Sequence, residues 1–457
     1  MRSRPWTSPT WGRIGSCTTS PRRRDEETVT AIDGRAPVTE PVWLSGGHVV
    51  DVRSGSIRRD TNVVVRDGRI ERITTDAPPP GARTVPLGGR YLLPGLISVH
   101  THLSVVYPFS DNDESENPGI TALRALSRAR EALYAGVTTI RTVHEQNRAD
   151  LLVRTAAGQG WVEAPRIVGA GRAISTTGGH GQGSGCAYAD GYDAFLRAAR
   201  TELAAGADLI KIFITGGIAH QGESFNGAQM TVDEMRAVVR AADEHGTYVT
   251  AHAGAGSAIR EALTAGVRGY EHAYDLDEAT ARQMAAQRVY LTPTLCVTRC
   301  PDWMAEHAFT PWQIERALEV GPGHLASIRT AIAAGVADPT DPEKPGITFL
   351  AGTDYPPGAP IEDTVVAVRE MEFLAEAGLD THQALRSGTL DAARLTGLEG
   401  QAGVVEEGHL ADLIVTERDP LSDLSALRRI TFVMQAGRVV RDDLPAVPDH
   451  HATEGAQ

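Results

Sequence analysis

Two histidines one residue apart offer the first metal-binding chemistry in this chain of 457 residues. His100 and His102 follow an apolar segment, residues 92–97, that contains a Pro-Gly step. In a β-strand, side chains two residues apart project to the same face. Because imidazole is a common ligand of divalent metals, we expect both side chains to bind one ion from the end of a strand.

A single lysine in an apolar segment is the second candidate. The chain contains only two lysines, Lys211 and Lys344, although lysine and arginine together number 44. Lys344 lies in a polar turn, whereas Lys211 lies in the strand-like segment 208–214. An unpaired ammonium is costly to bury. Since the chain otherwise uses arginine as its cation, Lys211 predicts a role that a guanidinium cannot fill.

Three further metal-competent residues close short apolar segments. His252 and His272 end the segments Thr-Ala-His and Tyr-Glu-His, and Asp354 ends Ala-Gly-Thr-Asp. Taken singly, each has a simpler reading as a hydrogen-bonded structural histidine or a loop cap. Taken together, they place metal-competent groups at the ends of successive strands, and this joint pattern favours one metal site.

Strand-like and helix-like segments alternate between these residues. We expect strands at residues 96–102, 137–143, 166–170, 208–214, 248–252, 269–272, 290–294 and 347–354. We expect helices at residues 120–135, 192–205, 232–245, 256–265, 277–287 and 324–334. Such alternation predicts an α/β fold with a parallel sheet, and eight units allow a (β/α)8 TIM-type barrel, with a doubly wound open sheet as the alternative. In a barrel, the active site lies at the carboxyl ends of the strands.

Short strands without helices flank this region on both sides. They are expected at residues 42–50, 62–65, 69–73 and 91–93, and again at 411–415, 431–435 and 437–440. Helices are expected near residue 370 and over residues 382–395. We expect residues 37–93 and 400–445 to form one small β-sandwich domain beside the barrel of residues 94–399. Residues 1–36 and 446–457 are expected to be a disordered leader and tail.

Composition narrows the class of protein. The formal net charge is 44 − 58 = −14, which argues against nucleic acid and anionic lipid as partners. No apolar segment reaches the roughly 20 residues that cross a bilayer. The four cysteines form no C-x-x-C pair, so a reducing cytoplasm is the expected location. The motifs of a Walker loop, a dinucleotide-binding loop and a serine-hydrolase elbow are absent from the sequence. The sequence leaves open whether the protein forms a homo-oligomer.

Seven short segments of the chain match a known set of motifs. They are Pro94-Gly-Leu-Ile-Ser-Val-His-Thr-His102, Thr138-Thr-Ile-Arg141, Ser175-Thr-Thr-Gly-Gly-His-Gly181, Ile210-Lys-Ile-Phe213, Ala251-His252, Glu271-His272 and Ala351-Gly-Thr-Asp354. With them, residues 42–445 resemble the amidohydrolase superfamily, specifically binuclear metal-dependent hydrolases related to Xaa-Pro dipeptidases and N-acyl amino acid deacylases. The resemblance to imidazolonepropionase is more distant. These motifs are specific for the superfamily and weak for the substrate.

The resemblance implies a centre with two divalent metal ions. His100 and His102 would bind the buried ion, and His252 and His272 the outer one. Asp354 would contact the buried ion and transfer protons.

Lys211 would bridge both ions after N-carboxylation by carbon dioxide. A neutral amine is able to form this carbamate, whereas a guanidinium is not deprotonated in proteins. Zinc is the expected metal for a histidine-rich site, with manganese or cobalt as alternatives.

Two positions depart from the family pattern. Ser98 stands where the family often has aspartate, and Arg141-Thr142 stands where it has Arg-Asp. Hydrogen-bond partners of metal-bound imidazoles are worth about 10- to 100-fold in affinity or activity. We therefore expect another residue to supply the missing partner.

The expected reaction is hydrolysis of an amide bond in a dipeptide or an N-acyl amino acid. A metal-bridging hydroxide would attack the carbonyl carbon, and Asp354 would pass the proton to the leaving nitrogen. His180, in a Gly-rich loop, is the second catalytic candidate. Arg172 or Arg299 is a hypothetical site for a substrate carboxylate.

Two alternatives remain at this stage. The same site would serve a cyclic amide, a carbamate or an ester, and a non-catalytic barrel scaffold is the alternative from another class. Four rim residues carry no spacing argument: His144, His220, Tyr274 and Tyr355.

Overall fold

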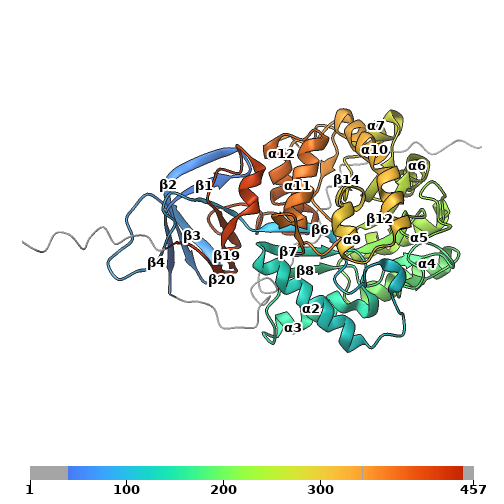
Figure 1. The fold of residues 1–457 in the computed structure, drawn as a ribbon, viewed down its shortest axis with the longest axis horizontal. Coiled ribbons are helices and arrows are strands. Elements are labelled where there is room, and N and C mark those ends of the chain that lie inside the picture. Colours follow the sequence, from blue (N-terminus) through green and yellow to red (C-terminus); the bar gives the residue numbers. More distant parts are fainter. Residues whose placement is uncertain (1–39, 342, 446–457) are drawn as a thin grey trace, which may run out of the picture.

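A computed structural model describes residues 40–341 and 343–445 of the chain (Figure 1). The predicted leader, residues 1–36, and the predicted tail, residues 446–457, lie outside the described residues. The described part contains a mixed sheet, at one end of the molecule, and a larger body of parallel strands and helices.

The mixed sheet joins strands from both ends of the described chain. Its N-terminal strands are β1 (Val42–Asp51), β2 (Ser56–Arg66), β3 (Arg69–Thr74), β4 (Arg83–Pro86) and β5 (Tyr91–Pro94), and its C-terminal strands are β18 (Leu413–Thr416), β19 (Ile430–Gln435) and β20 (Arg438–Asp442). The order is β20-β19-β18-β5-β1-β2-β3, with β4 beside β1. Because β18 pairs antiparallel with β5, the C-terminal strands rejoin the N-terminal ones, as the sequence predicts.

Tight turns fix the hairpins of this sheet. Asp67 and Gly68 join β2 to β3, and Ala436 and Gly437 join β19 to β20, all with positive φ. Two-residue turns of this kind match the twist of antiparallel strands and favour Asp-Gly. Side chains such as Val65 and Phe432 pack into an apolar cluster that belongs to this sheet alone.

Parallel strands form the larger body. One sheet contains β6 (Leu96–Thr101), β7 (Val137–Thr142) and β8 (Arg166–Gly169), and a second contains β9 (Ile174–Ser175), β10 (Ala187–Tyr188), β11 (Ile210–Phe213), β12 (Val249–Ala255), β13 (Gly269–Asp275), β14 (Tyr290–Thr292) and β15 (Thr348–Phe349). Main-chain hydrogen bonds link both outer strands of the three-stranded sheet, β6 and β8, to residues beside strands of the second sheet. The Asp208 N–H donates to the Gly169 carbonyl, and the Val99 N–H donates to the Ala351 carbonyl.

Helices separate these strands. They are α2 (Pro118–Tyr134), α3 (Ala149–Gly158), α4 (Tyr192–Ala204), α5 (Val232–His245), α6 (Gly256–Ala265), α7 (Glu278–Ala286), α8 (Cys296–Arg299), α9 (Pro301–Glu306), α10 (Pro311–Ala334), α11 (Val366–Ala377), α12 (Thr381–Ser387) and α13 (Leu390–Leu395). Helix α5 follows the prediction to the residue, because the Thr231 and Glu234 capping box begins it and Gly246 ends it.

Most predicted elements differ from the observed ones by a few residues at their ends, and three differ in a way that has a clear structural reason. Helix α10 begins at Pro311, where Thr310 and Gln313 form a capping box, so the expected segment 324–334 is only its second half. The predicted helix 382–395 is two helices, since Thr389 leaves the helical conformation. The predicted strand 347–354 pairs only over Thr348–Phe349, and Asp354 lies beyond it.

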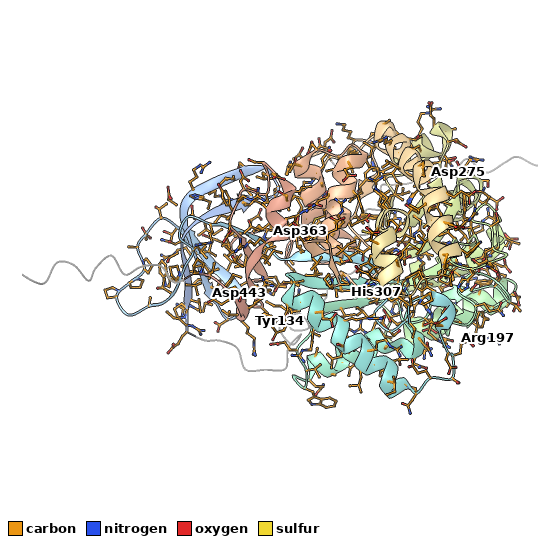
Figure 2. All side chains as sticks on the ribbon, in the orientation of Figure 1. Tyr134, Arg197, Asp275, His307, Asp363 and Asp443 are labelled. Carbon is orange, nitrogen blue, oxygen red and sulfur yellow. The ribbon has the colours of Figure 1, made fainter. Side chains whose placement is uncertain are left out.

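A buried ion pair and an exposed hydrogen bond join the mixed sheet to the larger body. Arg166 at the start of β8 contacts Asp412 at 2.6 Å, and both side chains are more than nine-tenths buried. Arg441 on β20 donates to the carbonyl of Tyr134 at the end of α2 and pairs with Asp443; Tyr134 and Asp443 are labelled in Figure 2. Within residues 40–341 and 343–445, each helix is too short or too polar to cross a membrane.

Candidate metal centre

His100 and His102 each have one ring nitrogen held by an acceptor from the protein. The Nδ1 of His100 lies 2.7 Å from a Glu271 carboxylate oxygen, and the Nδ1 of His102 lies 2.9 Å from the His144 carbonyl. A carbonyl and a carboxylate only accept, so both Nδ1 atoms carry the proton. When the ring is neutral, the Nε2 atom of each imidazole therefore offers its lone pair.

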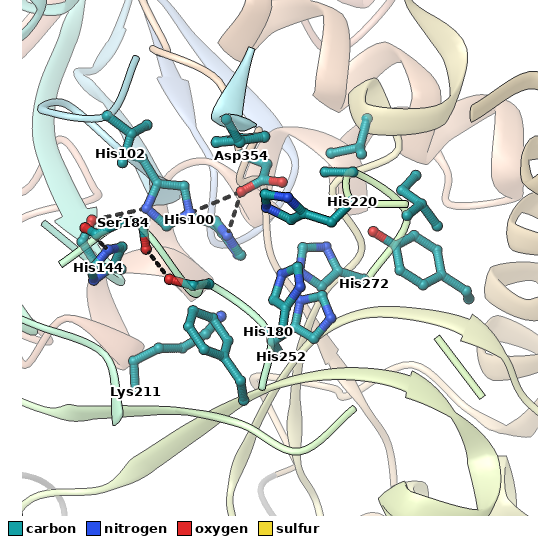
Figure 3. A pocket seen from close by; sticks show the side chains of 18 residues that line it. His100, His102, His144, His180, Ser184, Lys211, His220, His252, His272 and Asp354 are labelled. Atoms are coloured by element: carbon teal, nitrogen blue, oxygen red, sulfur yellow. Dashed lines mark hydrogen bonds and ion pairs between the residues drawn. The ribbon is translucent and has the colours of Figure 1, made fainter. Parts of the chain in front are cut away.

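Both of these Nε2 atoms face one carboxylate oxygen. The Oδ1 of Asp354 lies 3.0 Å from the Nε2 of His100 and 3.0 Å from that of His102 (Figure 3). Ligand atoms of the three residues lie within 4.8 Å of one another. With neutral imidazoles, three acceptors converge at this point, and a divalent cation between them would satisfy all three. The donor set thus fits a metal ion.

The main chain brings Asp354 to the histidines. The N–H groups of Thr353 and Asp354 donate to the His100 carbonyl at 2.9 and 3.1 Å. Gly352 permits this approach, because a Cβ there would lie 2.6 Å from the Cβ of His100. Burial raises the pKa of Asp354, but when the His100 and His102 rings also carry a proton on Nε2, their charge and hydrogen bonds outweigh burial and hold this pKa well below its usual range.

A buried network orients His100. Glu271 accepts from His100, from the Arg141 guanidinium at 2.6 Å and from the Thr250 hydroxyl. Although burial raises the pKa of Glu271, Arg141 and His100 bring it far below its usual range, so this carboxylate is ionised. Glu271 thus supplies the partner that the sequence expects in place of the aspartate missing at Ser98.

His252 and His272 are arranged by the same rule. The Nε2 of His252 donates to the Gly216 carbonyl at 3.1 Å, which leaves the lone pair of its Nδ1 free for a metal ion. The Nδ1 of His272 lies 2.7 Å from the Thr294 hydroxyl, which itself lies 2.6 Å from the Pro293 carbonyl. Thr294 therefore accepts from His272, and the Nε2 of His272 is free.

Lys211 lies on β11 with its side chain buried in the same pocket. Burial lowers the pKa of its amine to about 8. Among residues 40–341 and 343–445, no carboxylate lies within ion-pair distance of the amine, whose nearest described charge contact is with the ring of Phe213. A group that loses its proton this readily is available as the neutral amine that carboxylation requires.

A Gly-rich loop and the loop after β11 cover one side of the pocket. His180 stacks on His252 with ring centroids 4.2 Å apart, and its Nδ1 lies 2.6 Å from Glu223. Glu223 also accepts from the Gly217 N–H at 2.8 Å. The contact with His180 outweighs the effect of burial and lowers the pKa of Glu223 to about 2.

The pocket spans about 640 Å³, including the open solvent at its mouth, and combines these polar groups with an apolar wall. All seven candidate site residues line it: His100, His102, His180, Lys211, His252, His272 and Asp354. The apolar wall is formed by Val105, Phe109, Phe213, Ile218 and Val297. Six potential ligands from distant parts of the sequence are therefore gathered in one place, while their coordination of metal stays a prediction.

The other residues proposed from the sequence divide into two groups. His144, His220 and Tyr274 line the pocket, whereas Tyr355 is packed against Trp303 behind it. Both nitrogens of His144 are engaged, since Nδ1 accepts from the Ala173 N–H and Nε2 donates to the Ser184 carbonyl. Burial also lowers its pKa to about 3, so His144 is a neutral structural residue.

The two arginines proposed for a substrate carboxylate do not line the pocket. Arg172 pairs with Glu202 at 2.8 Å, and Arg299 pairs with Glu376 at 2.6 Å. Each guanidinium already has a carboxylate partner, which explains why neither turns towards the metal ligands. The hypothesis of an arginine at the rim is not supported by this structure.

Sequence reasoning missed the residues that orient the ligands. Glu271 stands beside His272 in a matched motif, but nothing in that motif indicates that it contacts His100 on another strand. Thr294 and Glu223 carry no spacing signal. The apolar wall also escaped prediction, because its residues come from five separate loops and elements and are indistinguishable in sequence from core residues.

Comparisons with known proteins agree with this geometry. The model of the amidohydrolase family matches residues 91–440. The ochratoxinase of Aspergillus niger is 26% identical over 388 residues, which cover 77% of this chain and 75% of that protein.

Two solved structures are similar over nearly their whole length. A prolidase complexed with N-methylphosphonate-L-proline superposes with a TM-score of 0.77 and 29% identity, covering 88% of this chain and 100% of that one. A Xaa-Pro dipeptidase with bound methionine in its active site gives a TM-score of 0.77 and 26% identity, with the same coverage. Because the family model matches most of its length, this chain belongs to the amidohydrolase family.

Proposed function

We propose that this protein is a binuclear metal-dependent hydrolase that cleaves the amide bond of a dipeptide or an N-acyl amino acid. The observation that carries the proposal is the meeting of three lone-pair acceptors, the Nε2 atoms of His100 and His102 and the Oδ1 of Asp354. A protein has little reason to bury three such acceptors together unless a cation lies between them.

The proposed scaffold is a closed (β/α)8 TIM-type barrel over residues 94–399. The hydrogen bonds from Asp208 to Gly169 and from Val99 to Ala351 support closure, because they link both outer strands of the three-stranded sheet to residues beside strands of the second sheet. The mixed sheet of residues 37–93 and 400–445 would form the small β-sandwich domain. In the proposed barrel the candidate ligands would lie on or after strands β6, β11, β12, β13 and β15, and such barrels hold their active sites at the carboxyl ends of the strands.

In the proposed centre, His100 and His102 hold the buried ion and His252 and His272 the outer one. Carboxylated Lys211 would contribute an oxygen to each. Zinc is the proposed metal, with manganese or cobalt as alternatives. When bound, the ions would make water a nucleophile near neutral pH and polarise the scissile carbonyl group.

The chain's own residues would then orient the substrate and move the proton. Asp354 lies beside both buried imidazoles, so its carboxylate is placed to accept the proton of the attacking water and deliver it to the leaving nitrogen. His180 stacks above His252 and is fixed by Glu223, which suits it to contact the carbonyl oxygen or a substrate carboxylate. The apolar wall would exclude water around the scissile bond.

Apolar lining favours a substrate with an apolar side chain or acyl group. Phe109, Phe213 and Val297 supply a contact surface beside the polar groups. The names of the similar proteins, a prolidase, a Xaa-Pro dipeptidase and ochratoxinase, support a small-molecule amide substrate for this chain as well. Cyclic amides, carbamates and esters are the alternative substrates for the same site.

The substrate proposal is tested with metal-reconstituted protein and matched pairs of compounds. N-acyl amino acids and dipeptides are assayed beside their ester and carbamate counterparts, and Asp354→Asn serves as the inactive control. We expect the highest kcat/KM for an amide with an apolar group. Higher turnover of every ester or carbamate would move the proposal to the alternative, and no turnover together with little bound metal would favour a non-catalytic scaffold.

The cellular setting follows from the sequence and is likewise a proposal. We propose a cytoplasmic enzyme that acts on a small molecule, without nucleic acid or membrane as partner, and with a homo-oligomer left open. Fractionation of the native host, probed for this chain, would test the location.

A further inference from the structure

The main chain at His272 has an unusual conformation. His272 and Ala273 have φ values of 70° and 57°, so two successive residues with side chains lie in the left-handed region. This region is disfavoured for L-residues other than glycine and persists where the surroundings impose it. His272 is also a proposed ligand of the outer metal, and the direction of its ring depends on this main chain.

The regular sheet cannot impose this conformation. Strand β13 pairs with β14 only through Gly269, Tyr270 and Glu271, and its pairing with β12 shifts register after His272. The carbonyl groups of His272 and Ala273 therefore need hydrogen-bond donors from elsewhere. Both find them on α10.

Two buried polar side chains of α10 contact these carbonyl groups. The Nε2 of His324 donates to the His272 carbonyl at 3.0 Å, and the Ser327 hydroxyl donates to the Ala273 carbonyl at 2.6 Å. The same hydroxyl accepts from the Leu276 N–H at 3.0 Å. Residues three apart share one face of a helix, so a single turn of α10 holds the whole left-handed segment.

His324 is itself fixed in place. Its Nδ1 lies 3.0 Å from the Thr298 hydroxyl, and its ring lies edge-on to Tyr274 at a centroid distance of 4.8 Å. Tyr274 in turn stacks on the His272 ring, with centroids 5.3 Å apart and planes at 9°. His324 thus reaches His272 through both its carbonyl group and its ring face, although neither His324 nor Ser327 lines the pocket.

We propose that His324 and Ser327 are positioning residues for His272. They hold the left-handed main chain so that the imidazole, anchored at Nδ1 by Thr294, presents its Nε2 to the outer metal. Together, His324 and Ser327 act as a brace for this segment. His100 lies on β6 and His102 directly follows it, and among the described residues neither has a hydrogen bond or ring contact with His324 or Ser327. Loss of the brace should therefore weaken the outer metal site and leave the buried site intact. Only this last consequence rests on the proposed two-metal function.

The test compares two alanine variants with conservative ones. His324→Ala and Ser327→Ala remove the donors, whereas His324→Gln keeps an N–H donor and Ser327→Thr keeps the hydroxyl. Ile328→Val is the matched control, because Ile328 is fully buried in the same helix and has no polar side-chain atom. Thermal unfolding of all five variants separates folding defects from local ones.

The first readout is amide hydrogen exchange in the metal-free full-length protein. We expect exchange of the segment from residue 272 to 277 to rise by about 10-fold or more in both alanine variants, since each variant leaves one carbonyl group of the segment without its donor, and Ser327→Ala also removes the acceptor of the Leu276 N–H. The conservative variants and Ile328→Val should resemble the wild type. Unchanged exchange in both alanine variants would overturn the inference, as would an equal change in Ile328→Val.

The second readout is equilibrium binding of Zn²⁺ against a chelating dye. The alanine variants should bind the second ion about 10- to 100-fold more weakly than the wild type, with the first ion unaffected. Equal weakening of both ions, or no weakening, would contradict the brace. If the wild type binds only one ion, the binuclear proposal fails, and hydrogen exchange still decides whether α10 holds the His272 segment.

Discussion

At the scale of single residues, hydrogen-bond partners decide which nitrogen each histidine offers to a metal. His100 and His102 are held at Nδ1, whereas His252 is held at Nε2. In each ring the engaged nitrogen faces a group that accepts a proton, so the other nitrogen keeps its lone pair. The lone pairs of the proposed metal centre are therefore oriented without an ion, and its affinity for metal should depend on these hydrogen-bond partners.

Glu271 gives the first prediction at this scale. Glu271→Gln removes the negative charge that orients His100 and pairs with Arg141. We expect metal affinity to fall by about 10- to 100-fold, measured by competition with a chelating dye. Glu370→Gln is the matched control, because Glu370 is a fully buried carboxylate that accepts from the Leu295 and Cys296 N–H groups and contacts no proposed ligand. Equal affinities of Glu271→Gln and the wild type would contradict the assigned role.

Lys211 gives the second prediction at the scale of single residues. Burial lowers the pKa of its amine to about 8, so the amine gains a proton as the pH falls below this value and is neutral above it. Only the neutral amine reacts with carbon dioxide. We therefore expect reconstitution of metal-free protein with Zn²⁺ and bicarbonate to become faster as the pH rises from about 7 to about 9.

Two variants of Lys211 complete this test. Lys211→Arg keeps a cation and should recover no activity at any pH, because a guanidinium cannot form the carbamate. Lys211→Ala should lose activity and regain part of it when a short carboxylate is added. A reconstitution rate independent of pH, or full activity in Lys211→Arg, would remove the bridging role.

The candidate metal ligands could be predicted from the sequence because their residue types are rare in apolar segments. Lys211 is one of only two lysines, and the matched motifs name each histidine. The hydrogen-bond partners of these ligands could not be predicted, since Glu271 and Thr294 contact side chains from other segments of the chain. The mistaken proposal of Arg172 shows the same limit, because sequence gave no sign of its pairing with Glu202.

At the scale of elements, strand positions follow directly from apolar patterning. Seven of the predicted barrel segments overlap parallel strands of three or more residues, whereas the last pairs over two only. The error at the last one has a physical reason: Gly352 and the left-handed Asp354 leave the ladder in order to approach His100. The apolar pattern predicts the strand, but it does not show that the main chain leaves the sheet before Asp354.

Helix α10 shows the opposite error. Pro322 suggests a boundary, because proline lacks the N–H that a helix interior needs. The helix nevertheless runs from Pro311 to Ala334 and buries His324 and Ser327 against β13. Tertiary contacts of this kind override local propensity, and they are not visible in a single sequence.

The loop after β11 gives a prediction at this scale. Glu223 ties His180 to the Gly217 N–H, so Glu223→Gln should free the His180 ring. We expect kcat/KM to fall by about 10-fold or more, with metal content unchanged. Steady-state kinetics on the best amide and metal analysis measure both. Glu244→Gln, in an exposed ion pair with Arg200, is the control and should leave kinetics unchanged. Unaltered kinetics in Glu223→Gln would show that this contact does not position His180.

At the scale of the whole molecule, the mixed sheet is attached to the parallel strands through buried polar contacts. Asp412 accepts from Arg166 through one oxygen and from the Ala436 N–H, at 2.8 Å, through the other. The change from short strands to alternating strands and helices near residue 94 predicts two units. It does not reveal this attachment, because the paired residues are 246 positions apart.

The attachment predicts a stability effect without a catalytic one. Asp412→Asn leaves the buried Arg166 guanidinium without its countercharge, so the free energy of unfolding should fall by about 3–5 kcal/mol. Urea unfolding measures this change, with the exposed pair of Arg200 and Glu244 as a control worth about 1 kcal/mol or less. A loss as small as that of the exposed pair would mean that the two units do not depend on this contact.

The central claim is that two metal ions lie in the pocket, bridged by modified Lys211. It is tested most directly by a crystal structure of Zn²⁺-reconstituted protein with anomalous diffraction at the zinc edge. We predict two anomalous peaks, one beside His100, His102 and Asp354 and one beside His252 and His272, with density for a carboxylate extending the Lys211 side chain between them. One peak alone, or an unmodified Lys211 turned away from the ions, would contradict the account.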